Sequence, residues 1–188
     1  METGHTQLRK YEEYAYVLDS KSRAKSTTVR GRIGIIVVAI GEERLTLLEI
    51  LGIENSTFDI GERIYIGKEG RTKVQSVLGK MDYVKISDST KDEIPIVVKT
   101  IVTKNEKKFV DYINNAQPLT PRIHALELIP GIGKTYLNVI IKEREKGSFE
   151  SFADIEKRVG LKEPIEHLSQ RIIEEISGET RMNLFVKR

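Results

Sequence analysis

The spacing of hydrophobic residues changes once along this 188-residue chain. From residue 11 to about residue 87, apolar residues come in short, β-branched runs separated by turn residues, a pattern typical of strands. Glycine punctuates these runs, as at Gly41 and Gly61. The pattern favours a small β-barrel over a parallel sheet with crossover helices. The predicted strands are 14–18, 33–40, 45–51, 63–66, 73–78 and 81–86.

Beyond Ser87 the apolar residues take a helical spacing. The segment 88–101 predicts a helix, although its many β-branched residues leave a strand pair open. A second helical run ends before Pro118, and Thr120-Pro121 has the form of an N-cap followed by a first-turn proline. These signals predict an all-helical second half. Its helices are expected at 88–101, 109–113, 121–129, 134–146, 151–159 and 164–176.

The fold class expected from both halves is α+β with two domains. Residues 1–88 would form a small β-barrel and residues 89–177 an all-α domain. The tail, 178–188, contains a short alternating run from Arg181 to Val186. This run either forms a strand that returns to the barrel edge or belongs to a frayed terminus.

Composition narrows the class of protein. The chain has no cysteine, so disulfides, cysteine-based zinc sites and thiol catalysis are excluded. The N-terminal residues have no apolar core of the signal-peptide type. The longest apolar run, 33–40, is far shorter than a membrane span needs. We therefore expect a soluble, cytoplasmic protein with no membrane association.

The net charge of +3 is small, but it is unevenly distributed. Basic and acidic residues balance between 109 and 188, whereas the stretch from Ser20 to Gly41 has five basic residues and no acidic one. Such a cluster is either a solvated loop or a contact for nucleic acid. Its members are Lys21, Arg23, Lys25, Arg30 and Arg32.

The sequence GIGKT, which begins at Gly131, suggests a phosphate-binding loop. A Walker loop would require glycine at 128, directly after a strand. Leu128 occupies that position and the preceding segment predicts a helix, so nucleotide hydrolysis is not expected. A dinucleotide fingerprint also fails, because Tyr136 stands where its third glycine belongs.

A tight glycine turn between two helices can bind phosphate in another way. Glycine permits positive φ and lets another backbone approach closely. The first N–H groups of the second helix have no intrahelical partner and carry the positive end of its dipole. Ile132 would point inward, while Lys134 would add a mobile charge. The expected nucleic-acid contacts here are Gly131, Ile132, Gly133, Lys134 and Thr135.

The stretch LELIPGIGK, residues 126–134, closely resembles a helix-hairpin-helix motif. The resemblance implies sequence-nonspecific binding of a nucleic-acid backbone, with a monovalent cation at the hairpin carbonyls as an option. Residues 147–155 resemble the connector of tandem units, and residues 158–164 resemble a degenerate second hairpin with one glycine lost. Leu137 departs from the pattern, since a small residue is usual there.

The first half resembles the oligonucleotide-binding (OB) fold, with the basic cluster in the loop between its first two strands. A barrel of this kind combined with Gln117–Pro121 and LELIPGIGK resembles an archaeal family of uncharacterised proteins predicted to bind RNA. The resemblance extends over nearly the whole chain. Tyr14, Tyr16, Tyr65 and Tyr83 fall on predicted strands, and which face they occupy stays open.

Catalytic signatures are missing from the sequence. His5, His124 and His167 lack metal-ligand spacing, and the latter two are expected on helix surfaces. No carboxylate cluster suits a two-metal nuclease. The sequence therefore predicts a non-enzymatic protein that binds RNA or DNA, leaving open which of the two. The alternative is a protein-interaction adaptor in a translation or DNA-repair assembly.

Overall fold

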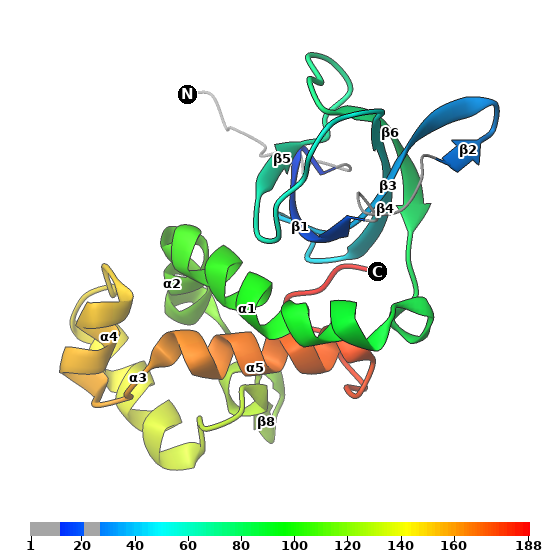
Figure 1. Ribbon diagram of the computed structural model, residues 1–188. Coiled ribbons are helices and arrows are strands. Elements are labelled where there is room, and N and C mark those ends of the chain that lie inside the picture. The colour runs from blue at the N-terminus through cyan, green and yellow to red at the C-terminus, as the bar shows by residue number, and fades with distance from the viewer. Residues whose placement is uncertain (1–11, 21–26) are drawn as a thin grey trace, which may run out of the picture. The chain divides into compact units, whose positions relative to one another are not determined.

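The computed structural model describes residues 12–20 and 27–188. The chain forms two compact units (Figure 1), one reaching to Asp82 and including Arg188, the other from Tyr83 to Lys187. We call them the β unit and the helical unit. Among the described residues, none of the helices has the length and apolar character to cross a bilayer.

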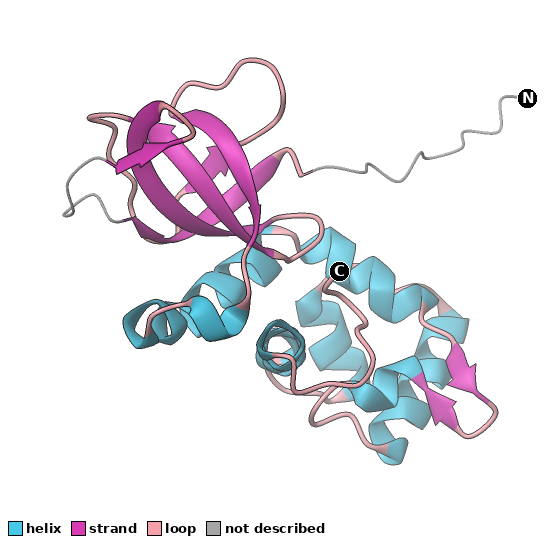
Figure 2. Cartoon of the chain, turned by 90° about the vertical axis from the view of Figure 1, so that its right-hand side faces the viewer, coloured by secondary structure: helices cyan, strands magenta, loops and turns pink. Residues whose placement is uncertain are grey.

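The β unit is a strongly curled antiparallel sheet (Figure 2). Its strands follow the order β5-β1-β3-β4-β6, and β2 pairs with β3 outside that path. The edge strands β5 and β6 pair with each other nowhere in the described chain, so the sheet is a half-barrel. The strands are β1 (Tyr14–Ser20), β2 (Thr27–Val29), β3 (Arg32–Gly41), β4 (Leu47–Ile53), β5 (Arg63–Tyr65) and β6 (Val74–Lys80).

Alternating apolar residues fill the concave side of this sheet. Val37, Ile50 and Ile64 come from three different strands and are almost fully buried, as expected when successive side chains point to opposite faces. Phe58, from the β4–β5 loop, packs so closely on Gly52 that a Cβ there would lie 2.6 Å from its ring. Glycine in mid-strand therefore makes room for the ring that closes one end of the core.

The predicted strands up to residue 78 are confirmed with shifted ends, but a strand at 81–86 is wrong. The backbone instead forms a short 3-10 helix, Tyr83–Lys85 (η2), and Ser87 then caps the next helix through its hydroxyl. Met81 makes the last ladder bond, donating its N–H to Leu47 at 2.9 Å. Residues 81–86 therefore form no strand; they connect β6 to the next helix.

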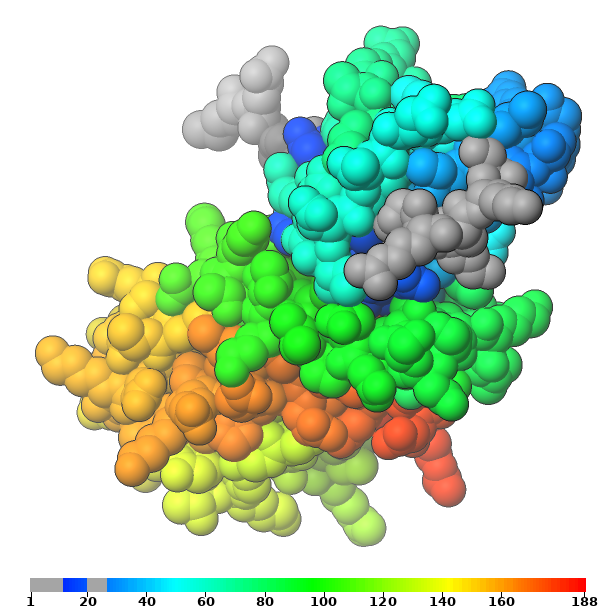
Figure 3. All heavy atoms as spheres, viewed as in Figure 1, coloured from blue at the N-terminus to red at the C-terminus, as the bar shows by residue number. Residues whose placement is uncertain are grey.

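The helical unit begins with the segment whose β-branched content left its structure open. It is a helix, because Ile94, Val97, Val98 and Ile101 share one buried face. Helix α5 lies along α1, as their adjoining surfaces show (Figure 3). The helices are α1 (Asp88–Lys104), α2 (Glu106–Asn115), α3 (Lys134–Lys146), α4 (Phe152–Val159) and α5 (Pro164–Ser177).

The helix predicted from 121 to 129 is wrong. A small hairpin, β7 (Pro118–Thr120) with β8 (Ile123–His124), precedes one 3-10 turn, η3 (Ala125–Leu128). The Thr120 hydroxyl accepts the N–H groups of residues 122 and 123, at 3.3 and 3.1 Å. The threonine thus stabilises a turn rather than a helix start. Its hydroxyl can accept backbone N–H groups equally well in either structure.

The tail contains no strand. The Glu175 carboxylate accepts the backbone N–H groups of residues 184, 185 and 186, at 2.6–2.9 Å. Phe185 packs against the rings of Phe109 and Tyr112, with centroids 5.8 and 4.6 Å away. Because a side chain of α5 satisfies the N–H groups that a strand would have paired, the alternating pattern anchors the tail to the helical unit.

Candidate nucleic-acid interface

The turn before α3 is a tight, hydrogen-bonded corner. The N–H of Ile132 donates to the carbonyl of Ile129 at 3.0 Å. Between them stand Pro130 and Gly131, and Gly131 has φ +86°. Proline at the second position and a positive φ at the third are the features of a type II turn. Ile132 is buried, so its side chain fixes the turn to the core while the glycines stay exposed.

Gly131 also has a close neighbour. A Cβ at this position would lie 2.3 Å from Nδ1 of His167, on α5. The other ring nitrogen, Nε2, lies 3.1 Å from the carbonyl oxygen of Lys162. The turn therefore requires glycine for two reasons, its backbone conformation and the imidazole packed against it.

Helix α3 starts with its first-turn amides unobstructed. Gly133 is the N-cap, with no side chain to cap the helix and no atom within 4 Å of where a Cβ would stand. Within the described chain, the N–H groups of residues 134–136 have no acceptor. Lys134 and Thr135 are exposed, and the first turn has no acidic residue. This is the geometry in which a helix N-terminus accepts an anion.

The start of α5 is built from similar parts and differs in charge. Gly160 ends α4 at φ +77°, and the buried Leu161 occupies the place of Ile132. Here Pro164 has no N–H, and the amide of Glu166 already donates to the carbonyl of Glu163 at 2.9 Å. Glu163 and Glu166 add two carboxylates at this helix start. Glu166 is ion-paired with Lys99, and the exposed Lys162 precedes Glu163, so the difference in charge from α3 is smaller than two carboxylates alone would give.

The 3-10 turn η3 is held by a reciprocal cap. Nδ1 of His124 accepts the N–H of Leu126 at 3.1 Å, and the Glu127 carboxylate accepts the N–H of His124 at 3.2 Å. His124 is buried rather than on a helix surface as expected. Burial, followed by the charge of Arg144, lowers the pKa of its imidazole below the ordinary value. Because Nδ1 accepts a hydrogen bond, the neutral form of the ring has its proton on Nε2, a buried atom with no acceptor in the described chain.

Arg171 joins this region to the tail. Its guanidinium donates to the carbonyls of Leu128 and Met182, at 3.0 and 2.5 Å, and to the Glu175 carboxylate at 2.9 Å. The pair is almost completely buried. The i,i+4 spacing of Arg171 and Glu175 on a predicted helix was the only signal in the sequence, and it does not reveal burial.

The basic cluster is only partly described. Lys21, Arg23 and Lys25 lie outside the described residues. Arg30 and Arg32 are exposed at the β2–β3 hairpin, whose two turn residues, Arg30 and Gly31, have φ +50° and +78°. Two positive φ values are typical of a type I′ turn. The turn belongs to the β unit and the glycine corner to the helical unit, so each is a separate candidate contact.

The tyrosines of the β unit serve its own structure. Tyr16 is buried and donates to Glu42 at 3.1 Å, and Glu42 also accepts two bonds from Arg63, at 2.8 and 2.9 Å. Arg63 lies 3.5 Å above the ring of Tyr14, which meets Tyr65 edge-on at 5.3 Å. No pair of stacked, open rings of the kind that binds single strands is formed by these residues.

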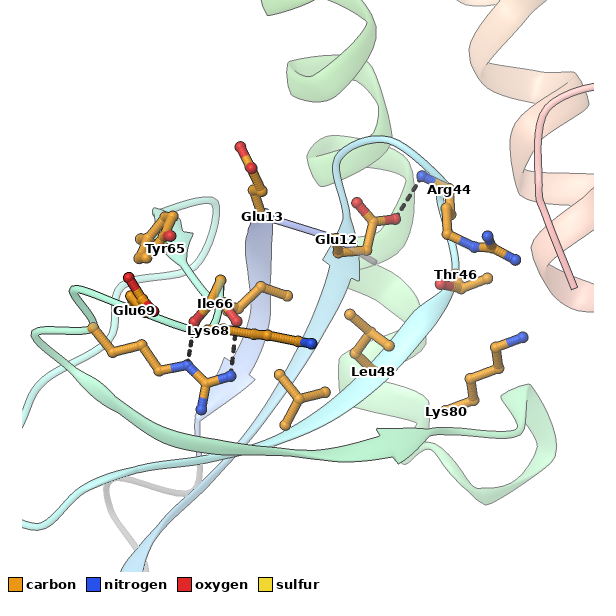
Figure 4. A pocket seen from close by; sticks show the side chains of 13 residues that line it. Glu12, Glu13, Arg44, Thr46, Leu48, Tyr65, Ile66, Lys68, Glu69 and Lys80 are labelled. Atoms are coloured by element: carbon orange, nitrogen blue, oxygen red, sulfur yellow. Dashed lines mark hydrogen bonds between the residues drawn. The ribbon is translucent and has the colours of Figure 1, made fainter. Parts of the chain in front are cut away.

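A pocket of about 920 Å³ opens at the mouth of the curled sheet (Figure 4). Its floor consists of Leu48, Ile66 and Val77, and its rim is charged.

Across the described residues, no three histidine or acidic side chains gather as a metal site would require. In the turn before α3, the carbonyls of Ile129 and Gly133 each accept one N–H, so a monovalent cation could use only their second lone pairs.

Comparison with known proteins gives consistent results. A family model described as "protein of unknown function (DUF655)" matches residues 11–187. The uncharacterised protein MJ0038 of Methanocaldococcus jannaschii is 38% identical over 181 residues, covering 95% of this chain and 82% of that protein. The crystal structure of Af1531 from Archaeoglobus fulgidus is similar with a TM-score of 0.80 and 37% identity, covering 94% of this chain and 100% of that one. The predicted resemblance to an uncharacterised archaeal family is confirmed.

Proposed function

We propose that this chain, which belongs to the DUF655 family, is a non-enzymatic protein that binds the backbone of RNA or DNA. In this proposal the glycine corner and α3 act as a helix-hairpin-helix clamp on one phosphate. The half-barrel acts as an OB-like module with basic contacts at its β2–β3 loop. The observation that carries the proposal is the set of unobstructed first-turn amides of α3, beside an exposed lysine and no carboxylate.

The α5 start supports this assignment by contrast. Its proline and its internally bonded amide leave it fewer free N–H groups than α3 has. A phosphate would therefore meet more open amides at α3 than at the paired position. The proposed clamp reads no bases, because only backbone amides and one flexible ammonium group face the ligand.

A second candidate function, protein docking, has its own observation. Leu119, Ile123 and Met182 are each about 40–50% exposed and line one hollow of about 420 Å³ in the helical unit. Exposed apolar side chains gathered in one place suit contact with another protein. Under this reading the helical unit is an adaptor and the glycine corner has only a structural role.

One substitution separates the two functions. Lys134→Glu places a carboxylate in the first turn of α3, where it interacts favourably with the helix dipole, so the protein should remain folded. The same carboxylate repels a phosphate. We expect binding of single-stranded RNA, RNA hairpins or duplex DNA, followed by fluorescence anisotropy, to weaken about tenfold or more. The slope of log Kd against log salt should also fall by about one.

Lys142→Glu is the matched control, because it makes the same charge change on an exposed residue of the same helix. It should alter binding much less than Lys134→Glu does. If both variants weaken binding equally, Lys134 contributes only through the net charge of the protein. If the unmodified protein binds none of the three nucleic acids at low salt, the proposal is wrong and the adaptor function gains support.

A further inference from the structure

The pocket at the mouth of the half-barrel is a preformed hollow. One of its walls is the loop after β5, where the Arg71 guanidinium donates to the carbonyls of residues 66, 67 and 75, at 3.0, 2.5 and 2.9 Å. Another wall is the β3–β4 turn, where the Glu12 carboxylate accepts the N–H groups of residues 43 and 44, at 2.8 and 2.5 Å. Both walls are therefore held without a ligand, which lowers the entropic cost of binding one.

The interior of the pocket is apolar. Leu48 and Ile66 belong to the sheet core and Val77 packs against it, yet all three also line the hollow. The core thus stops short of the mouth of the sheet. A volume of about 920 Å³ is enough for a small organic ligand or for part of a larger one.

The rim has charged side chains of both signs: Glu12 lies beside Arg44 at one end, and Lys68 lies between that end and Glu69 (Figure 4). Arg44 and Lys80 lie at one end on either side of Thr46, whereas Glu69 lies at the other end near Tyr65 (Figure 4). The register supports this placement, since Lys80 pairs with Leu48. The side chains of Arg44, Lys80 and Glu69 have no ion pair or side-chain hydrogen bond within the described residues. A fitting ligand has an anionic end, a flat apolar middle and a hydrogen-bond donor at the far end.

We propose that this pocket binds one nucleotide. Its phosphate would lie between Arg44 and Lys80, its base over Leu48 and Val77, and an amino group of the base toward Glu69. The nucleotide is either a free nucleoside monophosphate or one unpaired nucleotide of a strand. A lipid chain fits less well because it has no donor for Glu69, and a base held in a duplex cannot enter. This site is distinct from the proposed clamp on α3 and does not depend on it.

The test is a titration of the ¹⁵N-labelled full chain, followed by amide chemical shifts. The probes are adenosine monophosphate, adenosine, inorganic phosphate and a single-stranded penta-adenylate. We expect the monophosphate to shift the amides of residues 48, 77 and 80. Arg44→Gln and Lys80→Gln should each weaken its binding about tenfold while leaving adenosine binding almost unchanged. Lys142→Gln is the matched control in the helical unit.

The outcomes separate the sources of the nucleotide. If only the penta-adenylate shifts these amides, the site takes a nucleotide within a strand; if the monophosphate binds equally well, it takes the free compound. If neither shifts them at about 1 mM, or phosphate alone matches the monophosphate, the proposal is wrong. Lys134→Glu should leave the pocket shifts unchanged, so failure of the clamp and failure of the pocket give different results.

Discussion

The starts of α3 and α5 are two versions of one corner that differ in their free amides and in their first-turn side chains. Each follows a glycine at positive φ and a buried aliphatic residue, Ile132 in one and Leu161 in the other. At α3 the amides are open and a lysine follows. At α5 a proline removes one amide, and Glu163 and Glu166 supply carboxylates. The backbone shape of a helix start is thus separable from its ability to attract an anion, which depends on the first-turn side chains.

The largest expected effect concerns Arg171, which holds the stretch before the first corner to the middle of α5 and to the tail. Arg171→Met removes the guanidinium that holds the carbonyl of Leu128, before the first corner, to α5. It also leaves Glu175 as a buried charge without its basic partner. We expect a loss of about 3 kcal/mol in the free energy of unfolding, measured by urea denaturation. A loss below about 1 kcal/mol would show that the tail amides alone satisfy Glu175.

The two corner glycines should respond differently to alanine. Gly131→Ala combines an unfavourable φ with a methyl group placed against His167, and should cost about 3 kcal/mol. Gly160→Ala has a similar φ but no atom within 4 Å of the new methyl group, and should cost about 1 kcal/mol. Thermal unfolding of both variants checks the difference. Adding His167→Ala to Gly131→Ala should recover the part of the lost stability that comes from the clash with the imidazole. If Gly131→Ala and Gly160→Ala alone lose the same stability, the close packing of His167 on Gly131 is contradicted.

Glu163 offers a substitution that should stabilise the protein. It is a non-glycine residue at φ +50°, so Glu163→Gly should raise the free energy of unfolding by up to about 1 kcal/mol. The same change removes one carboxylate from the α5 start. Any gain in nucleic-acid affinity should remain below about tenfold, because Pro164 has no N–H and the amide of Glu166 already donates to the carbonyl of residue 163. Calorimetry and anisotropy on this variant test both statements.

The smallest expected effect is a pH dependence through His124. Its pKa is lowered in the folded protein, so the unfolded chain binds the proton more readily. Its contribution to stability is complete above the unfolded pKa of about 6.5 and is lost as pH falls through the lower folded value. Urea denaturation at a series of pH values should show this loss. His124→Asn, which keeps a cap acceptor but cannot titrate, should abolish it; an identical loss in both proteins would assign it to other groups.

The sequence predicted local structure well where one signal dominated. Short β-branched runs separated by turn residues located five strands of the β unit, and the shared apolar face of α1 outweighed its β-branched composition. Prediction failed where the same residues are compatible with two different local structures. Thr120-Pro121 is compatible with a helix start or a turn, and 181–186 with a strand or an anchored tail. The choice depends on partners distant in the chain, here Glu175 for the tail.

By itself, the sequence determined the α+β class, the position of the glycine corner and the absence of cysteine chemistry, because spacing and residue type act locally. Only the tertiary structure decided the rest. It placed His167 against Gly131, buried Arg171 and Glu175 beneath the tail, and left Arg44, Lys80 and Glu69 around one apolar hollow. These arrangements join residues that lie far apart in the chain, and their energies arise from desolvation and close packing, which no local pattern encodes.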